Sequence, residues 1–197
     1  MTVLEDHLAK LRRALDGLHD IEAPLEAAAG SIARSLGTGG KLLAAGNGGS
    51  AAEAQHLTGE FVGRLDPARE RQALPAVALH ADTSTLTAVG NDYGFDSVFS
   101  RQVEALGCAN DVLVVLSTSG ASTNLVRAVE AASDRGMISV GLLGPGSRPL
   151  HERCTHVLAV RTDSPQAVQE CHLVLVHVLV ELVEDLLSDT AGSQRRG

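Results

Sequence analysis

Five short runs of Val, Leu and Ala recur along the chain, and segments with helical apolar spacing separate them. The runs are KLLAAG (41–46), LPAVALHA (74–81), DVLVVLS (111–117), MISVGLLG (137–144) and HVLAVR (156–161). Runs that are apolar at consecutive positions are typical of strands buried on both faces. Because such strands alternate with helices here, the sequence predicts an α/β protein with a doubly wound, five-stranded parallel sheet.

Two predicted helices precede the first strand, and one long helix follows the last. Apolar positions recur every 3.6 residues or so over 3–19 and 22–36, and a glycine cluster at 37–40 ends the second helix. Ser164 and Pro165 suit the N-cap and first turn of a helix that continues to about Leu187. The helices expected between strands are 50–63, 84–89 with 95–106, 122–135 and 148–153.

The length of 197 residues and a hydrophobic content of 44% fit one domain with its own core. We expect four parts: assembly helices at 1–38, an α/β core at 41–163, a long C-terminal helix at 164–188 and a disordered tail at 189–197. The C-terminal helix is apolar nearly all round, so it needs more cover than one α/β layer provides. We therefore expect subunits to associate.

Charge and cysteine content argue against several classes of protein. A formal net charge of −8 disfavours nucleic-acid binding and attachment to membrane surfaces. The three cysteines are widely spaced and form no CxxC pair, which indicates free thiols in a reducing compartment. The first thirty residues lack a signal-peptide core, and no apolar run reaches the roughly 20 residues of a spanning helix. A cytoplasmic location is expected.

Two loops of small residues follow the first and third predicted strands and lead directly into helices. They read GNGGSAAEAQ and STSGASTNLV. Such turns leave backbone N–H groups free at the positive end of a helix dipole, where an anion can approach closely. The hydroxyl groups that would share one phosphate belong to Ser50, Ser117, Thr118, Ser119 and Ser122. The alternative is ordinary capping, for which Ser, Thr and Asn are preferred; two such loops at adjacent strand ends favour phosphate.

A histidine and a carboxylate follow the first loop. His56 and Glu60 are four residues apart, so they share one face of a helix and can point at a common metal ion or substrate. The alternative is a solvated helix face. The long C-terminal helix carries His172 and His177, which lie about 140° apart around its axis. Periodicity does not choose between these two, and a buried histidine is often only a hydrogen-bonded core residue.

The motifs GNGGSAAEAQH, GEFVGR, GNDYGF, LSTSGAS and VQECHLVLVH lie between residues 40 and 187. Their order and spacing resemble those of the phosphoheptose isomerases of the sugar isomerase (SIS) superfamily. The resemblance implies a three-layer, flavodoxin-like SIS sandwich preceded by N-terminal helices, in a homotetramer with active sites between subunits. It further implies isomerisation of a phosphorylated heptose, sedoheptulose 7-phosphate, to D-glycero-D-manno-heptose 7-phosphate, and one bound zinc ion per subunit.

The resemblance also implies roles for individual residues. The implied metal ligands are His56, Glu60, Gln169 and His177. The implied substrate contacts are Asn47, Gly48, Gly49, Ser50, Glu60, Arg64, Asn91, Asp92, Ser117, Thr118, Ser119, Ser122 and Gln169. One position departs from the family pattern, because Gln166 stands where many relatives carry an acidic residue. This change removes a charge that would face sugar hydroxyls.

The implied chemistry suits these residue types. Moving a carbonyl from C2 to C1 requires removal of a proton from the neighbouring carbon, through an enediol or enediolate. A carboxylate can take that proton, which makes Glu60 the predicted base, and His177 is the predicted acid/base partner. The alternatives are a non-catalytic SIS protein that binds phosphosugars or regulates by binding the replication initiator, and an SIS isomerase of another phosphosugar. The presence of both Glu60 and His177 favours an enzyme.

Overall fold

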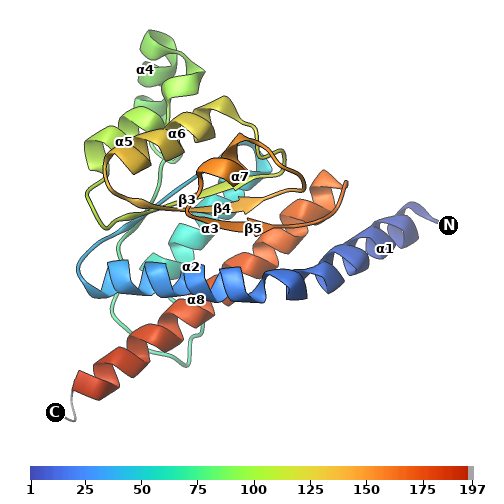
Figure 1. Ribbon diagram of the computed structural model, residues 1–197, viewed down its shortest axis with the longest axis horizontal. Helices are drawn as coiled ribbons and strands as arrows, with labels where there is room; N and C mark the ends of the chain where they lie inside the picture. Colours follow the sequence, from blue (N-terminus) through green and yellow to red (C-terminus); the bar gives the residue numbers. More distant parts are fainter. Residues whose placement is uncertain (195–197) are drawn as a thin grey trace.

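The structure of the chain is a computed structural model that describes residues 1–194, and it confirms the predicted five-stranded, all-parallel sheet (Figure 1). The strands are β1 (Leu42–Gly46), β2 (Ala76–Ala78), β3 (Val112–Ser117), β4 (Ile138–Leu143) and β5 (His156–Ala159). Their order in the sheet is β2-β1-β3-β4-β5. The chain therefore reverses direction across the sheet between β1 and β3, and the carboxyl ends of these two strands flank the switch point where open α/β sheets bind ligands.

Helices precede, connect and follow these strands. The α-helices are α1 (Val3–Asp16), α2 (Glu22–Gly37), α3 (Gly49–Val62), α4 (Thr83–Tyr93), α5 (Ser100–Leu106), α6 (Thr123–Asp134), α7 (Pro149–Arg153) and α8 (Pro165–Gln194). Two short 3₁₀-helices, η1 (Gly17–Ile21) and η2 (Phe95–Ser97), join α1 to α2 and α4 to α5. Within residues 1–194, none of the helices combines the length and apolar character that crossing a bilayer requires.

Two boundaries differ from those expected. The strand expected over 74–81 is limited to the three residues of β2, an edge strand that pairs only with β1. Pro75 has no N–H group, so it contributes only its carbonyl, which accepts a hydrogen bond from Leu42 N. The last helix continues past 188 to Gln194, since neither proline nor glycine interrupts the chain before Gly192. Residues 195–197 of the expected tail lie outside the described part.

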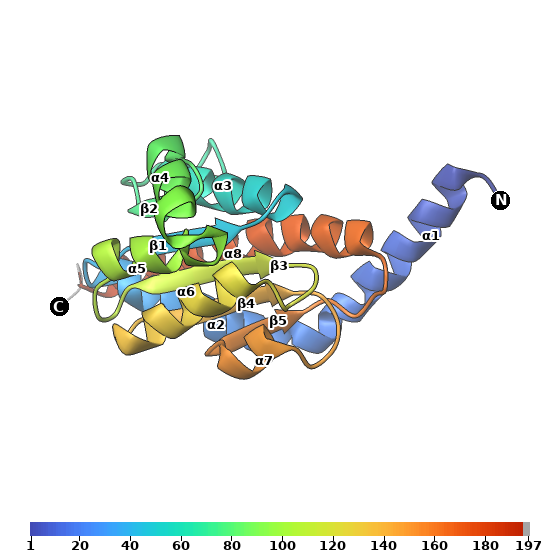
Figure 2. The same cartoon turned by 90° about the horizontal axis from the view of Figure 1, so that it is seen from above.

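The two faces of the sheet are covered by different helices, which gives the predicted three layers. Leu42 and Ala44 of β1 belong to a core shared with α2, α3 and α8. Leu43 and Ala45, which alternate with them, face a second core formed with α5, α6 and α7. Figures 1 and 2 show these layers, with α1 projecting beyond the sheet. Only Ala14 of α1 is buried.

A buried ion pair joins the starts of β1 and β3. The Asp111 carboxylate, whose side chain is 3% exposed, accepts hydrogen bonds from Lys41 Nζ at 2.6 Å, from Lys41 N at 2.9 Å and from Cys108 N at 2.8 Å. Burial alone would raise the pKa of this carboxyl, but the bonds from Lys41 and Cys108 outweigh it and lower the pKa below its usual range. Asp111 thereby fixes the two strands that carry the small-residue loops at their other ends.

The three thiols are free, as the sequence predicted. Cys108 is exposed, Cys154 is partly buried and Cys171 is fully buried. Burial raises the pKa of Cys154 to about 12 and that of Cys171 to about 11. These two thiols therefore stay protonated near neutral pH.

Candidate active site

Two helices from distant parts of the sequence, α3 and α8, pack side by side and bring the predicted catalytic side chains together. Ala54, Leu57 and Phe61 form the buried stripe of α3. His56 and Glu60 lie one turn apart beside that stripe, at the edge of the helix that remains accessible. The accessible fraction is 41% for the His56 side chain and 20% for that of Glu60, so a solute can reach both.

His177 of α8 completes this group. Its Nε2 atom lies 2.9 Å from His56 Nε2, and His56 Nε2 lies 3.5 Å from Glu60 Oε1. The two imidazole rings meet edge to face, with centroids 5.1 Å apart. One nitrogen from each histidine and one oxygen from Glu60 all lie within 4.8 Å of one another.

The other histidine of α8 has different surroundings. His172 is completely buried, and neither of its ring nitrogens has a hydrogen-bond partner. The Glu53 carboxylate of α3 lies 3.8 Å from Nδ1. Of the two histidines that periodicity left open, His177 is the one that meets His56 and Glu60.

The donor set formed by His56, Glu60 and His177 fits a divalent metal ion. Two imidazole nitrogens and a carboxylate oxygen are ligands that zinc prefers, and catalytic zinc sites commonly use three protein ligands and keep one position open. The spread of 4.8 Å or less between the donor atoms is small enough for all three to face one ion. These residues therefore could hold a metal.

Gln169, the fourth ligand implied by the resemblance, lies near the start of α8, and its side chain packs against the start of α3. A Cβ atom placed on Gly49 would come within 2.5 Å of Gln169 Nε2, so the glycine leaves the space that the amide occupies. Gly49 is seven residues before His56, which corresponds to about 10 Å along a helix axis. The structure thus brings Gln169 to the first small-residue loop, and its role as a metal ligand stays a prediction.

The first loop turns sharply into α3. Gly48 has φ +57° and ψ −122°, a conformation that side-chain-bearing residues rarely adopt. It occupies the N-cap position, and no side chain caps the helix there. Ser50 in the first turn is 4% exposed. The N-terminal amides of α3 are therefore not occupied by a capping side chain and can face an anion.

The second loop connects β3 to α6 and is held by its own serines. Ser117 Oγ accepts a hydrogen bond from Gly120 N at 3.1 Å, and Ser119 Oγ accepts one from Ala121 N at 3.3 Å. Ser122 is the N-cap residue of α6, yet its side chain makes no capping bond. Thr118 and Ser119 line a cavity of about 430 Å³ next to this loop. Ser117 and Ser119 thus shape the loop, while the hydroxyl of Ser122 remains available to a ligand.

The side-chain amides of Asn47 and Asn124 link the two loops. Asn124 was not predicted as a site residue from the sequence. Asn47 Nδ2 donates to Asn124 Oδ1 at 3.0 Å, and Asn124 Nδ2 donates to Asn47 Oδ1 at 2.9 Å. Asn124 is 3% exposed and lies in the first turn of α6. Asn47 was predicted as a substrate contact. Its side-chain amide bonds to Asn124 and so links the loops, and its predicted substrate contact would use what remains of its hydrogen-bonding capacity.

Three other predicted substrate contacts lie elsewhere on the surface. Arg64 follows α3 and forms an ion pair with Glu70 at 2.5 Å. Asn91 and Asp92 occupy the last turn of α4, are exposed, and bond to each other at 2.8 Å. Figure 1 shows α4 standing out from the sheet, and this helix buries none of its residues. Within residues 1–194 no hydrogen bond or ion pair joins these three to the two loops or to His56.

Residues 6–144 match the SIS domain family. Over 170 residues the chain is 49% identical to a phosphoheptose isomerase of Rhodospirillum rubrum, a match that covers 86% of this chain and 89% of that protein. Over 195 residues it is 43% identical to a phosphoheptose isomerase of Bradyrhizobium sp., with 96% of each chain covered.

Solved structures give the same result. The phosphoheptose isomerase of Neisseria gonorrhoeae superposes with a TM-score of 0.86 at 41% identity, covering 92% of this chain and 97% of that one. The enzyme of Francisella tularensis gives a TM-score of 0.87 at 35% identity, covering 94% of this chain and 100% of that one. With this sequence identity, this fold and these loops, the chain belongs to the phosphoheptose isomerases, within the SIS domain family.

Proposed function

We propose that the chain converts sedoheptulose 7-phosphate to D-glycero-D-manno-heptose 7-phosphate, with Glu60 as the base and His177 as its acid/base partner. The observation that carries this proposal is the convergence of Glu60 and His177 on His56, at 3.5 Å and 2.9 Å from the same His56 nitrogen. An aldose-ketose isomerase needs a carboxylate and a mobile proton donor within reach of two neighbouring carbons. The activity named for relatives at 43% and 49% identity also supports it.

In the proposed reaction, Glu60 takes a proton from C1 of the open-chain ketose, and the C2 carbonyl becomes an enediolate. His177 gives a proton to the oxygen on C2 and accepts one from the oxygen on C1. Glu60 then returns its proton to C2, which leaves an aldehyde at C1. The sum moves two hydrogens between adjacent carbons and oxygens and consumes nothing. His56 lies within 3.5 Å of both groups and orients them.

The sugar phosphate would bind at the two small-residue loops. The uncapped N-terminus of α3 and the free hydroxyl of Ser122 at the start of α6 support this role. Thr118, Ser119 and Ser50 would add donors. Gln169, whose side-chain amide lies against Gly49 of the first loop, is suited to bind a sugar hydroxyl.

We propose zinc as the metal, held by His56, Glu60 and His177, with Gln169 as a predicted fourth contact. When bound, such an ion supplies a Lewis acid for the sugar oxygens. Glu60 would then hold the ion through one carboxylate oxygen and act as the base through the other.

We also propose the homotetramer with active sites between subunits. Leu173, Val174 and Val178 are 36% to 40% exposed on α8, on either side of His177 in sequence, and they offer an apolar surface to another subunit. The exposed end of α4 is suited to bring Asn91 and Asp92 to the site of a neighbouring copy. The proposed location is the cytoplasm, since Cys108 is an exposed free thiol, which fits a reducing compartment.

A product assay tests the proposed function. Purified protein is incubated with sedoheptulose 7-phosphate, and ¹H and ¹³C NMR follow the appearance of an aldoheptose phosphate. A panel of other phosphoketoses is run in parallel. Conversion of sedoheptulose 7-phosphate at the highest rate supports the proposal. Preference for another member of the panel would make the chain an isomerase of that sugar, and no conversion of any member would reject the catalytic roles.

A further inference from the structure

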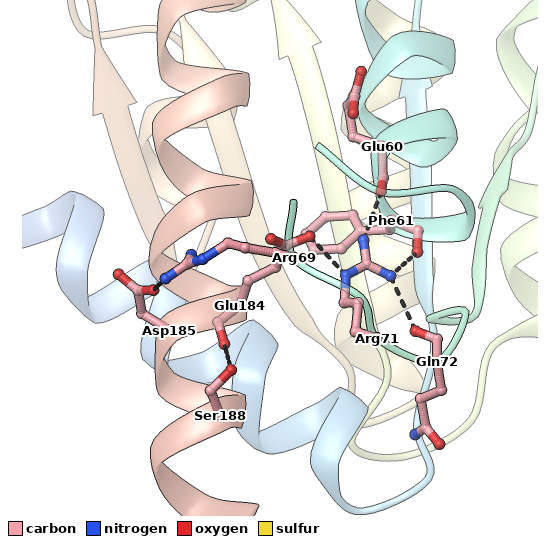
Figure 3. A network of polar contacts seen from close by, with 8 residues as sticks. All are labelled: Glu60, Phe61, Arg69, Arg71, Gln72, Glu184, Asp185 and Ser188. Atoms are coloured by element: carbon pink, nitrogen blue, oxygen red, sulfur yellow. Dashed lines mark hydrogen bonds and ion pairs between the residues drawn. The ribbon is translucent and has the colours of Figure 1, made fainter. Parts of the chain in front are cut away.

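Arg71 lies in the segment that follows α3, and its guanidinium occupies the space between the end of α3 and the flank of α8 (Figure 3). The side chain is only 15% exposed. α3 carries Glu60 and α8 carries His177, so Arg71 stands between the two helices that supply the catalytic pair. The reaction proposed above assigns it no role.

On the α3 side, Arg71 binds the last carbonyl groups of the helix. Nη2 donates to Glu60 O at 2.7 Å, and Nη1 donates to Phe61 O at 3.0 Å. Such carbonyls at a helix C-terminus have no partner inside the helix, and they carry the negative end of its dipole. In Figure 3 the Glu60 carboxylate points away from the guanidinium, so Arg71 holds the backbone of the base and leaves its side chain free.

On the α8 side, Arg71 Nε donates to Glu184 Oε1 at 2.6 Å. The Glu184 side chain is 5% exposed, which makes this an ion pair largely shielded from water. Glu184 follows His177 by seven residues, which is close to two helical turns, so both side chains lie on the same stripe of α8. The ion pair and His177 therefore contact α3 from one face of α8.

Only arginine has the donors that this position uses. A fourth bond, from Nη1 to Gln72 O at 3.0 Å, holds the segment that carries Arg71. Together the bonds use Nε, Nη1 and Nη2 in three directions, which the planar guanidinium spans without rearrangement. A lysine ammonium is a single point charge, so it can keep the contact with Glu184 but cannot also reach both carbonyls.

We infer that Arg71 and Glu184 form a positioning clip that sets the distance between the backbone of Glu60 and the helix of His177. The inference rests on the proposed function, because it concerns the geometry of the proposed base and acid/base partner. Loss of the clip would let the last turn of α3 move relative to α8. Since a displacement of about 1 Å in a catalytic group can cost on the order of 100-fold in rate, the effect should appear in turnover. The first phosphate loop lies at the other end of α3 and the second leads into α6, so substrate binding should change little.

The test compares Arg71→Lys with a matched control, Arg69→Lys. Arg69 lies two residues earlier and pairs with Asp185 at 2.6 Å, next to Glu184, but both side chains are about half exposed (Figure 3). Within residues 1–194 neither forms a hydrogen bond or ion pair with α3. For Arg71→Lys we expect kcat to fall by about 10-fold to 100-fold while KM changes less than about threefold. We also expect zinc affinity, measured by competition with a chromophoric chelator, to fall by about 10-fold, as it does when residues that support metal ligands are changed. Arg69→Lys should match the wild type in all three quantities.

Thermal unfolding monitored by circular dichroism shows which variants are folded at the assay temperature. If Arg71→Lys does not fold, Glu184→Met, which removes the acceptor for Nε, and the double variant Arg71→Met/Glu184→Met, which leaves no unpaired charge, are measured by the same criteria. Wild-type values of kcat and zinc affinity in any folded variant lacking the clip would overturn the inference. Failure of all three variants to fold would also overturn it, because the clip would then be a folding element only. An inactive wild-type protein would instead reject the proposed function.

Discussion

The Nε2 atoms of His56 and His177 lie 2.9 Å apart, although 121 positions separate the two residues in sequence. Two imidazole nitrogens at this distance cannot both present lone pairs to each other. Either one ring donates a proton to the other, or both face a shared cation. Both arrangements suit a site in which protons move between sugar oxygens, and the second is the arrangement of a metal centre.

Replacing Glu60 with glutamine removes the proposed base and keeps the size of the side chain. We expect kcat to fall by about 100-fold to 10,000-fold, because general base help of this size would be lost, with KM nearly unchanged. Steady-state kinetics with sedoheptulose 7-phosphate at saturating zinc measures both constants. Glu104→Gln, an exposed change on α5, serves as the control. Full turnover by the Glu60 variant would remove Glu60 from its role.

Removal of the metal should lower activity reversibly. Treatment with a chelator is expected to abolish turnover, and added Zn²⁺ should restore it, if His56, Glu60 and His177 hold the ion. His56→Ala should weaken zinc binding, measured by metal analysis after dialysis, whereas His19→Ala, an exposed histidine in η1, should not. Activity that changes neither on chelation nor on addition of zinc would contradict a role for the metal.

The serines of the second loop should act through substrate binding. We expect the double change Ser119→Ala/Ser122→Ala to raise KM for the phosphorylated sugar by about 10-fold or more, since each lost hydrogen bond to a charged group costs roughly 1.5 to 3 kcal/mol. Ser133→Ala, an exposed serine near the other end of α6, is the matched control. An unchanged KM would return Ser119 and Ser122 to a purely structural role.

The coupling energy between the side chains of Asn47 and Asn124 should be measurable. Asn124→Ala leaves the amide of Asn47 without its partner, so we expect a loss of about 1 to 3 kcal/mol in the free energy of unfolding. Urea denaturation of the two single variants and of the double variant gives a double-mutant cycle. The loss in the double variant should be clearly smaller than the sum of the single losses. Simple additivity would show that the two loops are not coupled through this contact.

The Lys41–Asp111 pair should make stability depend on pH at the acid end. Because the pKa of Asp111 is lower in the folded protein than its usual value near 3.8, the pair contributes fully above that value and is lost as pH falls through the folded pKa. Asp111→Asn should cost roughly 2 to 4 kcal/mol at pH 7. In urea denaturation the difference from wild type should shrink steadily below about pH 4. A difference that stays constant down to pH 2 would contradict this assignment.

The core of the fold is predictable from the sequence because parallel strands are apolar on consecutive residues. The runs at 111–117 and 137–144 give β3 and β4 almost to the residue. The run at 74–81 is a poorer guide, because only pairing partners decide how far an edge strand extends, and β2 has a partner on one side only. Local sequence contains no information about that partner.

The site is partly predictable for the same physical reason. His56 and Glu60 share one helix, so their spacing alone places them together, and the glycines mark the loops. Contacts across the chain are different: Asn124 looks like any first-turn asparagine, and Arg71 looks like a charged residue of a surface loop. Only the packing of α3, α6 and α8 reveals that these side chains are buried and bonded.

The long separation between His56 and His177 also has a consequence for synthesis of the protein. The ribosome makes both small-residue loops and His56 well before it makes α8. His177 follows 121 residues after His56. Because α8 also supplies part of the core that packs against α2 and α3, the nascent chain can complete neither that core nor the site until this last helix docks.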